Sequence, residues 1–254
     1  MKLNIVPART GIQWVRLGIR TFFKRPLALA SLFFIYAAGA SFLSLVPYIG
    51  WVLALAIVPA ATLGLMAATE DAATGHFPMP TVLLSAFRVG RQRGRAMLVL
   101  GALYTAGSLV ATVLGSLVGG SGASGGDSTG QSVDPRTVAV LVLHLPLVVL
   151  FWHAPALVHW HGVPPVKSLF FSAVACLRNA RALLVYGFAW VVVFLVAGFA
   201  ISAIGMMVGG LAVARSIMMP TVLVLVAMFS TSLYFTFRDS FRADEPQELP
   251  DAPL

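Results

Sequence analysis

Charged residues are scarce in this chain of 254 residues: Asp, Glu, Lys and Arg together make up 10% of it. A soluble globular domain carries about 25%. This shortage, together with 59% apolar residues and a mean hydropathy of +0.90, excludes an ordinary soluble protein. The composition therefore predicts a polytopic membrane protein.

Cysteine is nearly absent, since Cys176 is the only one. A single thiol excludes a disulfide framework and any multi-cysteine zinc or iron–sulfur site. Neither an H-E-x-x-H zinc motif nor a G-x-x-x-x-G-K-[ST] phosphate loop occurs, so metalloprotease and ATPase chemistry lack their residues. No cleavable signal peptide is expected, because the first apolar run begins only after Pro26 and has the length of a full span.

Carboxylates are missing from the apolar segments. A transmembrane helix needs about 20 mostly apolar residues. Six segments qualify, and none of them contains Asp, Glu, Lys or Arg. The predicted spans are 27–46, 48–68, 96–118, 137–160, 182–207 and 216–237. Because coupled carriers commonly place Asp or Glu at the bilayer midplane, coupled ion transport of the usual kind is disfavoured.

The basic residues fall almost entirely on one side of this plan. Of the 17 Lys and Arg residues, 15 precede the first span, follow the sixth, or lie in the loops on that same side. Only Arg136 and Arg215 lie on the other side. The positive-inside rule therefore predicts that both termini are cytoplasmic. The net charge of +8, which would suggest nucleic acid in a soluble protein, indicates membrane orientation here.

We expect one integral membrane domain over residues 1–254, with two polar segments. Residues 119–136 form a Gly/Ser-rich outer loop with the composition of a flexible linker. Residues 238–254 form a cytoplasmic tail, and its prolines and acidic residues after Arg242 predict disorder.

A weak threefold repeat runs through the chain. Similar segments begin near Phe22, Phe87 and Val174, and each passes through a basic cluster into an odd-numbered span. We predict an all-α fold of six transmembrane helices in three hairpins, each preceded by an interfacial amphipathic helix. The alternative to a true repeat is a chance likeness among apolar segments. The even-numbered spans contain Pro59, Pro155 and Pro220, candidate helix breaks or substrate positions.

Each stretch before an odd-numbered span has basic residues opposite an apolar face at helical spacing. In the first, Ile12, Val15 and Phe22 lie on the apolar face. Such a helix lies in the membrane interface and contacts anionic headgroups. The predicted headgroup contacts are Arg16, Arg20, Lys24, Arg88, Arg91, Arg95, Lys167, Arg178 and Arg181. Ordinary positive-inside signals without lipid specificity are the alternative interpretation.

Three segments carry a family resemblance: FWHAPALVHWHG, PPVKSLFFSAVACLRNARALLVYGF and SLYFTFRDSF. They resemble a family of uncharacterised six-helix inner-membrane proteins of Gram-negative bacteria. The resemblance rests on apolar patterning and on a few polar marks, which are Pro155, Ser172, Asn179, Tyr234, Arg238 and Asp239. It implies an inner-membrane location and the six-span plan. It implies no activity and no catalytic residue.

Histidines are the only ionisable residues within a predicted span. His144, His153 and His159 lie in the fourth span, with His161 just beyond it. Imidazoles can bind haem or a metal, contact a substrate or relay protons. Helical spacing aligns these side chains poorly, so no preformed cluster is expected. The sequence predicts no metal and no cofactor. It favours neutral histidines that are hydrogen-bonded within the bundle or lie at the headgroup level, with substrate contact or proton relay as the alternative.

The leading hypothesis is a non-enzymatic inner-membrane protein whose basic cytoplasmic face engages anionic lipids or a membrane partner in envelope organisation. Its partners would be the phospholipid bilayer, with a second copy or another membrane protein as further candidates. The G-x-x-x-G patterns at Gly115 and Gly205 predict close helix packing within the bundle, and a homodimer contact is the alternative role. The competing hypothesis is a carrier or channel for a small or amphiphilic solute, with Pro59, His153 and Pro155 beside its path.

Overall fold

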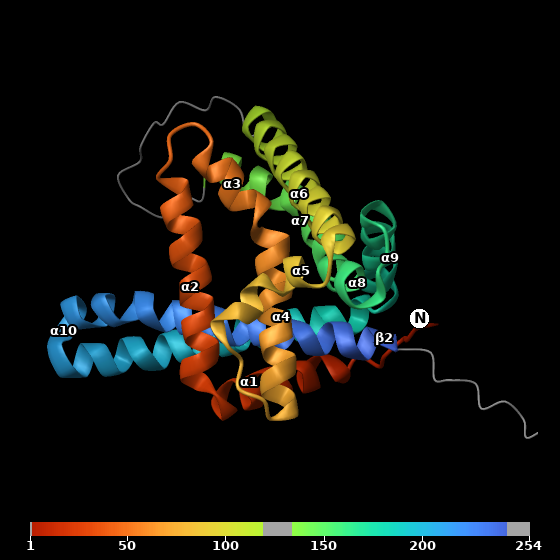
Figure 1. Ribbon diagram of the computed structural model, residues 1–254. Coiled ribbons are helices and arrows are strands. Elements are labelled where there is room, and N and C mark those ends of the chain that lie inside the picture. The colour runs from red at the N-terminus through yellow and green to blue at the C-terminus, as the bar shows by residue number, and fades with distance from the viewer. Residues whose placement is uncertain (1, 119–133, 243–254) are drawn as a thin grey trace, which may run out of the picture. The chain divides into compact units, whose positions relative to one another are not determined.

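The computed structural model describes residues 2–118 and 134–242, and this part of the chain is nearly all helical (Figure 1). In chain order the elements are β1 (Lys2–Leu3), α1 (Thr10–Lys24), α2 (Pro26–Ser44), α3 (Gly50–Ala56), α4 (Val58–Thr74), the 3-10 helix η1 (Pro80–Leu84), α5 (Ser85–Arg88), α6 (Arg91–Val118), α7 (Pro135–Phe151), α8 (Ala154–His161), α9 (Pro165–Arg178), α10 (Ala180–Ser240) and β2 (Phe241–Arg242).

Four helical stretches are long and apolar enough to cross a membrane: α2, α6, α7 with α8, and α10. Helices α3 and α4 give a fifth if the two, bent by 42°, count as one span. The sequence predicted six. The difference lies in α10, whose 61 residues cover both the fifth and the sixth predicted spans.

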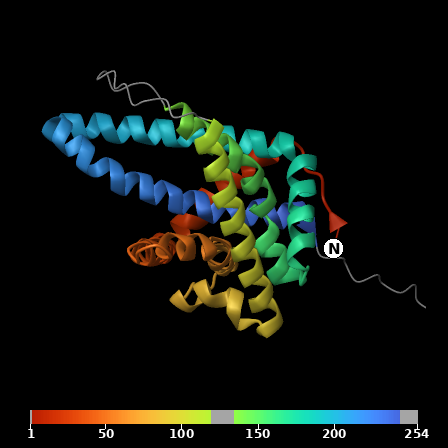
Figure 2. The ribbon, with the colours of Figure 1, turned by 90° about the horizontal axis from the view of Figure 1, so that it is seen from above.

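Helix α10 is folded back on itself at Gly209 and Gly210, as Figures 1 and 2 both show. Gly210 has φ +69° and ψ −161°, a conformation essentially restricted to glycine. At Gly205 the arms are so close that an added Cβ would lie 2.6 Å from the Ala214 Cα atom. Likewise, a Cβ added to Gly115 of α6 would lie 2.7 Å from the Val140 Cα atom of α7. Both glycines therefore allow close helix packing within this chain.

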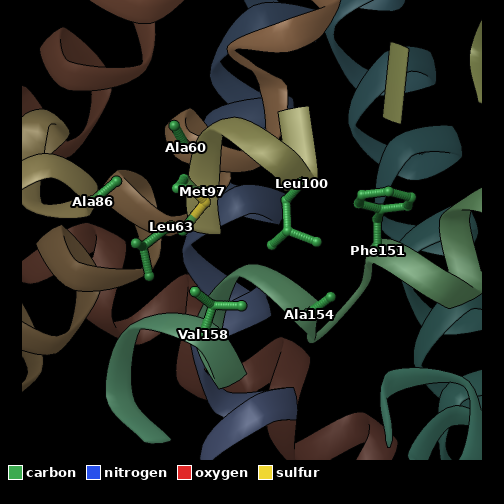
Figure 3. Packing of buried hydrophobic residues seen from close by; sticks show 8 residues of the cluster. All are labelled: Ala60, Leu63, Ala86, Met97, Leu100, Phe151, Ala154 and Val158. Atoms are coloured by element: carbon green, nitrogen blue, oxygen red, sulfur yellow. The ribbon is translucent and has the colours of Figure 1, made fainter. Parts of the chain in front are cut away.

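The chain divides into two compact units. The first holds residues 2–30, 69–78 and 177–242 of the described chain, and the second holds residues 31–68, 79–118 and 134–176. In the second unit, α6 packs on α3 and α7. Its apolar core gathers side chains from α4, α5, α6, α7 and α8 (Figure 3). The core residues are Ala60, Leu63, Ala86, Met97, Leu100, Phe151, Ala154 and Val158.

In the first unit, α1 packs along α10. An added Cβ on Gly11 would overlap the Ala182 carbonyl oxygen, and one on Gly18 would overlap the Ser232 side chain. Trp14, fully buried between these glycines along α1, meets the Tyr186 ring edge-on. Small residues thus bring the helices together, and the aromatic pair fills the space between them.

Two predicted segments differ from expectation where the structure describes them. The tail was predicted to begin at residue 238, but α10 continues to Ser240 and Phe241 then pairs with Leu3 in an antiparallel two-stranded sheet. Asp134, placed in the outer loop, is the N-cap of α7 and accepts a hydrogen bond from the Arg136 amide at 3.0 Å. Residues 119–133 and 243–254, the remainder of these segments, lie outside the described residues.

Candidate functional site

The two ends of the chain meet around Asn179, the N-cap of α10. Its side-chain carbonyl accepts from the Val6 amide at 2.9 Å, and its side-chain amide donates to the Asn4 carbonyl oxygen at 3.1 Å. The same amide lies 3.4 Å from the Ser240 hydroxyl. Because Asn179 is only 2% exposed, these bonds satisfy polar groups that water reaches poorly. Asn179 therefore joins the N-terminal segment to both ends of α10.

Asp239 extends this junction. Its carboxylate accepts from the Trp14 indole at 2.9 Å and pairs with the Arg238 guanidinium, also at 2.9 Å. Its backbone carbonyl accepts from the Asn4 side-chain amide at 2.9 Å. A polar cavity of about 580 Å³ borders Asn4, Thr10, Arg238 and Asp239. We call these bonded residues (Asn4, Val6, Trp14, Asn179, Arg238, Asp239 and Ser240) the terminal junction.

The terminal junction holds three of the polar marks of the family resemblance: Asn179, Arg238 and Asp239. A fourth, Tyr234, donates to the Glu70 carboxylate at 3.5 Å within the same unit. In the sequence these four residues stand out as polar features of the family, but Asn4 and Trp14 do not. Trp14 lies on the face of α1 opposite Arg16 and Arg20, and this helical spacing could have indicated that it is buried.

Ser172 occupies a helix break in the second unit. In an unbroken helix the His153 amide would donate to the Val149 carbonyl. Instead that amide donates to the Ser172 hydroxyl at 3.0 Å, and the hydroxyl donates to the Val149 carbonyl at 2.9 Å. The Ser172 hydroxyl thus bridges the amide and carbonyl groups that one helical hydrogen bond would join, two residues before Pro155. A hydroxyl or water inserted in this way is a common cause of helix kinks.

The predicted break positions differ among themselves. Pro59 lies just inside α4, after the 42° bend, and Pro155 lies just inside α8. Each proline therefore lies in the first turn of a helix that follows a break, where its missing amide hydrogen costs no helical hydrogen bond. Pro220, however, lies within continuous helix, and the interruption of α10 is at Gly209 and Gly210. Of the two roles predicted for Pro220, the helix break is absent, because the backbone keeps helical angles there; the role as a substrate position stays a prediction.

His144, His153 and His159 have separate surroundings, and His161 is the last residue of α8. His144 contacts the Val140 carbonyl within α7 at 2.8 Å. His153 is 1% exposed at the start of α8, and His159 is buried against the Trp160 ring. Among the described residues no group of three or more His, Cys, Asp or Glu side chains could hold a metal ion.

All nine predicted headgroup contacts are exposed: Arg16, Arg20, Lys24, Arg88, Arg91, Arg95, Lys167, Arg178 and Arg181. On α1, Arg16, Arg20 and Lys24 recur every four residues and form one stripe. Beside them lie Ile12, 52% exposed, and Phe23, 65% exposed. Val15 and Phe22, expected among acyl chains, are instead buried in the protein, since the wide apolar face is divided between α10 and the exterior.

Helix α9, like α1, has one buried side, one exposed apolar side and one basic side. Its buried side carries small residues, among them Ser168, Ser172 and Ala175. Val166 and Phe170 are exposed on another side, next to Lys167. An exposed apolar stripe beside basic residues is the pattern of a helix that lies at a membrane surface.

The middle amphipathic stretch is not one helix. It consists of η1 and α5, and Gly90, with φ +116°, separates them from α6. Arg91 and Arg95 therefore belong to the first turns of α6 rather than to an interfacial helix. The prediction is wrong here because a left-handed glycine interrupts the helical spacing.

Cys176 is 4% exposed, and its thiol donates weakly to the Val149 carbonyl at 3.7 Å. Burial raises the pKa of this thiol to about 12, against a smaller lowering by the hydrogen bond with Ser172. Alkylation requires the thiolate. We expect maleimide to label Cys176 about a thousandfold more slowly at pH 7.5 than a thiol of ordinary pKa of about 8.5.

Labelling kinetics from pH 7 to pH 10 would check this expectation. The rate at Cys176 should rise about tenfold per pH unit throughout, whereas an exposed thiol levels off above about pH 8.5. The control is Lys167→Cys in a Cys176→Ser background, an exposed position on the same helix. Equal rates at the two positions would contradict the buried, protonated thiol.

The apolar helices, the close helix contacts at their glycines and their exposed apolar side chains are typical of a helical membrane protein. The chain is 38% identical, over 260 aligned residues, to a probable inner membrane protein of Burkholderia thailandensis. The alignment covers 97% of this chain and 96% of the relative. The chain therefore belongs to this family of inner-membrane proteins, as the resemblance predicted. No protein-family model and no solved structure matches it.

Proposed function

We propose that this inner-membrane protein is non-enzymatic and binds anionic phospholipids through its exposed basic residues, as part of envelope organisation. The observation that carries the proposal is the pairing of basic and exposed apolar stripes on α1, with a similar arrangement on α9. Each basic residue near an anionic surface contributes about 1 kcal/mol. Three such residues on α1 alone are expected to bind strongly.

The proposal includes six membrane crossings with both termini cytoplasmic. The two arms of α10 count as separate crossings, because each is about 29 residues long and would extend about 44 Å at about 1.5 Å per residue. That length exceeds the hydrocarbon thickness of about 30 Å. Arg181 and Arg238 lie at the same end of this hairpin, which the positive-inside rule assigns to the cytoplasm.

The carrier or channel alternative receives less support. It requires a polar path beside the helix breaks at Pro59 and His153. Their neighbours Ala60 and Ala154 belong instead to the apolar core of the second unit. A packed apolar core offers a solute no polar contacts and little space.

The test replaces the basic stripe of α1 by Arg16→Gln, Arg20→Gln and Lys24→Gln together. These side chains are exposed, so the helix should remain folded. Native mass spectrometry of protein released from nanodiscs of equal phosphatidylglycerol and phosphatidylcholine would count retained lipids. We expect the wild type to retain mainly phosphatidylglycerol and the variant to lose about tenfold to a hundredfold in relative affinity.

A charge-retaining control, Arg16→Lys with Arg20→Lys, should keep the preference for phosphatidylglycerol. If the wild type retained both lipids equally, or if the Gln variant matched it, the lipid function would be rejected.

A further inference from the structure

An open groove lies between the arms of α10 near the Gly209–Gly210 turn. Its volume is about 440 Å³, and its lining includes Met206, Leu211, Arg215, Met218, Met219 and Val222. Volumes of this size accommodate small ligands. The lining is almost entirely apolar, and the methionine side chains adapt readily to an irregular or flexible apolar partner.

Arg215 is the single charged residue from position 182 to position 237. It is exposed in the groove lining, and that whole stretch contains no carboxylate to neutralise it. A ligand that matches this groove has one negative group and a flexible apolar chain. Arginine binds phosphate through two parallel hydrogen bonds, which makes phosphate the natural negative group.

The position of Arg215 along α10 fits the depth of a lipid headgroup. Arg215 and Arg238 are separated by 23 residues of helix, or about 35 Å at about 1.5 Å per residue. This distance slightly exceeds the hydrocarbon thickness of about 30 Å. If Arg238 lies at the cytoplasmic surface, Arg215 lies at the headgroups of the opposite leaflet.

We infer that this groove binds one anionic phospholipid of the outer leaflet, with its phosphate on Arg215 and an acyl chain along Met206, Met218 and Met219. A zwitterionic lipid would bind less well, because the groove has no carboxylate for its cationic group. The inference rests on the proposed crossing of the membrane by α10 and is independent of the basic residues at the cytoplasmic end.

Native mass spectrometry in the same mixed nanodiscs tests the site. We expect Arg215→Gln to lose one tightly held phosphatidylglycerol, seen as about a tenfold fall in occupancy of that lipid, while Arg215→Lys retains part of it. Arg136→Gln is the matched control, since Arg136 is exposed, has the same charge and belongs to the same predicted side. Unchanged phosphatidylglycerol occupancy in Arg215→Gln would overturn the inference.

A second experiment separates this site from the proposed topology. Met207, 88% exposed beside the turn, is replaced by Cys in a Cys176→Ser background and labelled in intact cells with a membrane-impermeant maleimide. Labelling from outside is expected and supports the crossing. Labelling only after the inner membrane is permeabilised would reject both the topology and the outer-leaflet site. External labelling with unchanged lipid occupancy in Arg215→Gln would reject the groove alone.

Discussion

Replacing Gly11 by leucine is expected to separate α1 from α10 and to destabilise the first unit strongly. An added Cβ would overlap the Ala182 carbonyl oxygen and lie 2.7 Å from the Tyr186 amide nitrogen, and backbone atoms cannot rotate away. Overpacking of this kind costs about 1–3 kcal/mol and occasionally more. Displacing α1 would also expose the buried Trp14 and break its bond to Asp239.

Thermal unfolding in detergent would measure this effect, and we expect the midpoint to fall by about 5–10 °C. Gly198→Leu in α10 is the matched control. It is also a helical glycine, but an added Cβ would meet nothing within 4 Å. Its midpoint should remain near that of the wild type or rise slightly, because leucine favours helix over glycine. Equal losses in the two variants would show that tight packing at Gly11 is not the cause.

The sequence predicted the position of α1 well, but it predicted only partly what the apolar side chains of α1 contact. Helical spacing between Ile12 and Pro26 identified the helix, and the exposed basic stripe lies where it was expected. The same spacing does not reveal which apolar residues face protein and which face lipid, because a bilayer and a protein core favour the same side chains. The division between Val15 and Ile12 depends on a partner helix that is distant in the sequence.

Glycine positions account for the larger differences. Gly90 divides the middle amphipathic stretch, and Gly209 with Gly210 reverses α10 in two residues where a longer loop was expected. The sequence shows where these glycines are, but it does not show which of them adopt a non-helical conformation, because that depends on the packing of the helices around them. The proline breaks were more predictable at Pro59 and Pro155, because proline cannot supply a backbone hydrogen bond. Pro220 shows that a long apolar helix can accommodate one.

The terminal junction could be anticipated only in part. Asn179, Arg238 and Asp239 stand out as polar residues at the ends of a long apolar stretch. Their partners are up to 235 positions away, as in the bond from Asn4 to Asp239, and no local pattern predicts such a pairing. The family resemblance marked three of these residues, and the structure shows that they hold the ends of the chain together.

Replacing Asn179 by alanine is therefore expected to release the N-terminal segment. The change leaves the Val6 amide and the Asn4 carbonyl without their side-chain partner. Each poorly solvated group left unpaired costs about 1–3 kcal/mol, so the loss should be near 3 kcal/mol. The other described bonds that hold the segment to α10 and β2 lie at Lys2, Leu3 and Asn4. Local release around Val6 should therefore precede global unfolding.

Limited proteolysis would detect this release at Arg9, an exposed trypsin site in the segment that Asn179 holds. We expect cleavage after Arg9 to be about a hundredfold faster in Asn179→Ala, since about 3 kcal/mol corresponds to a factor of that order. Arg178→Ala changes the exposed neighbouring residue and should leave the rate within about twofold. Comparable acceleration in both variants would mean that the bonds of Asn179 do not hold the segment. Acceleration in Asn179→Ala alone would assign the junction to anchoring the N-terminal segment, beside the basic stripe of α1.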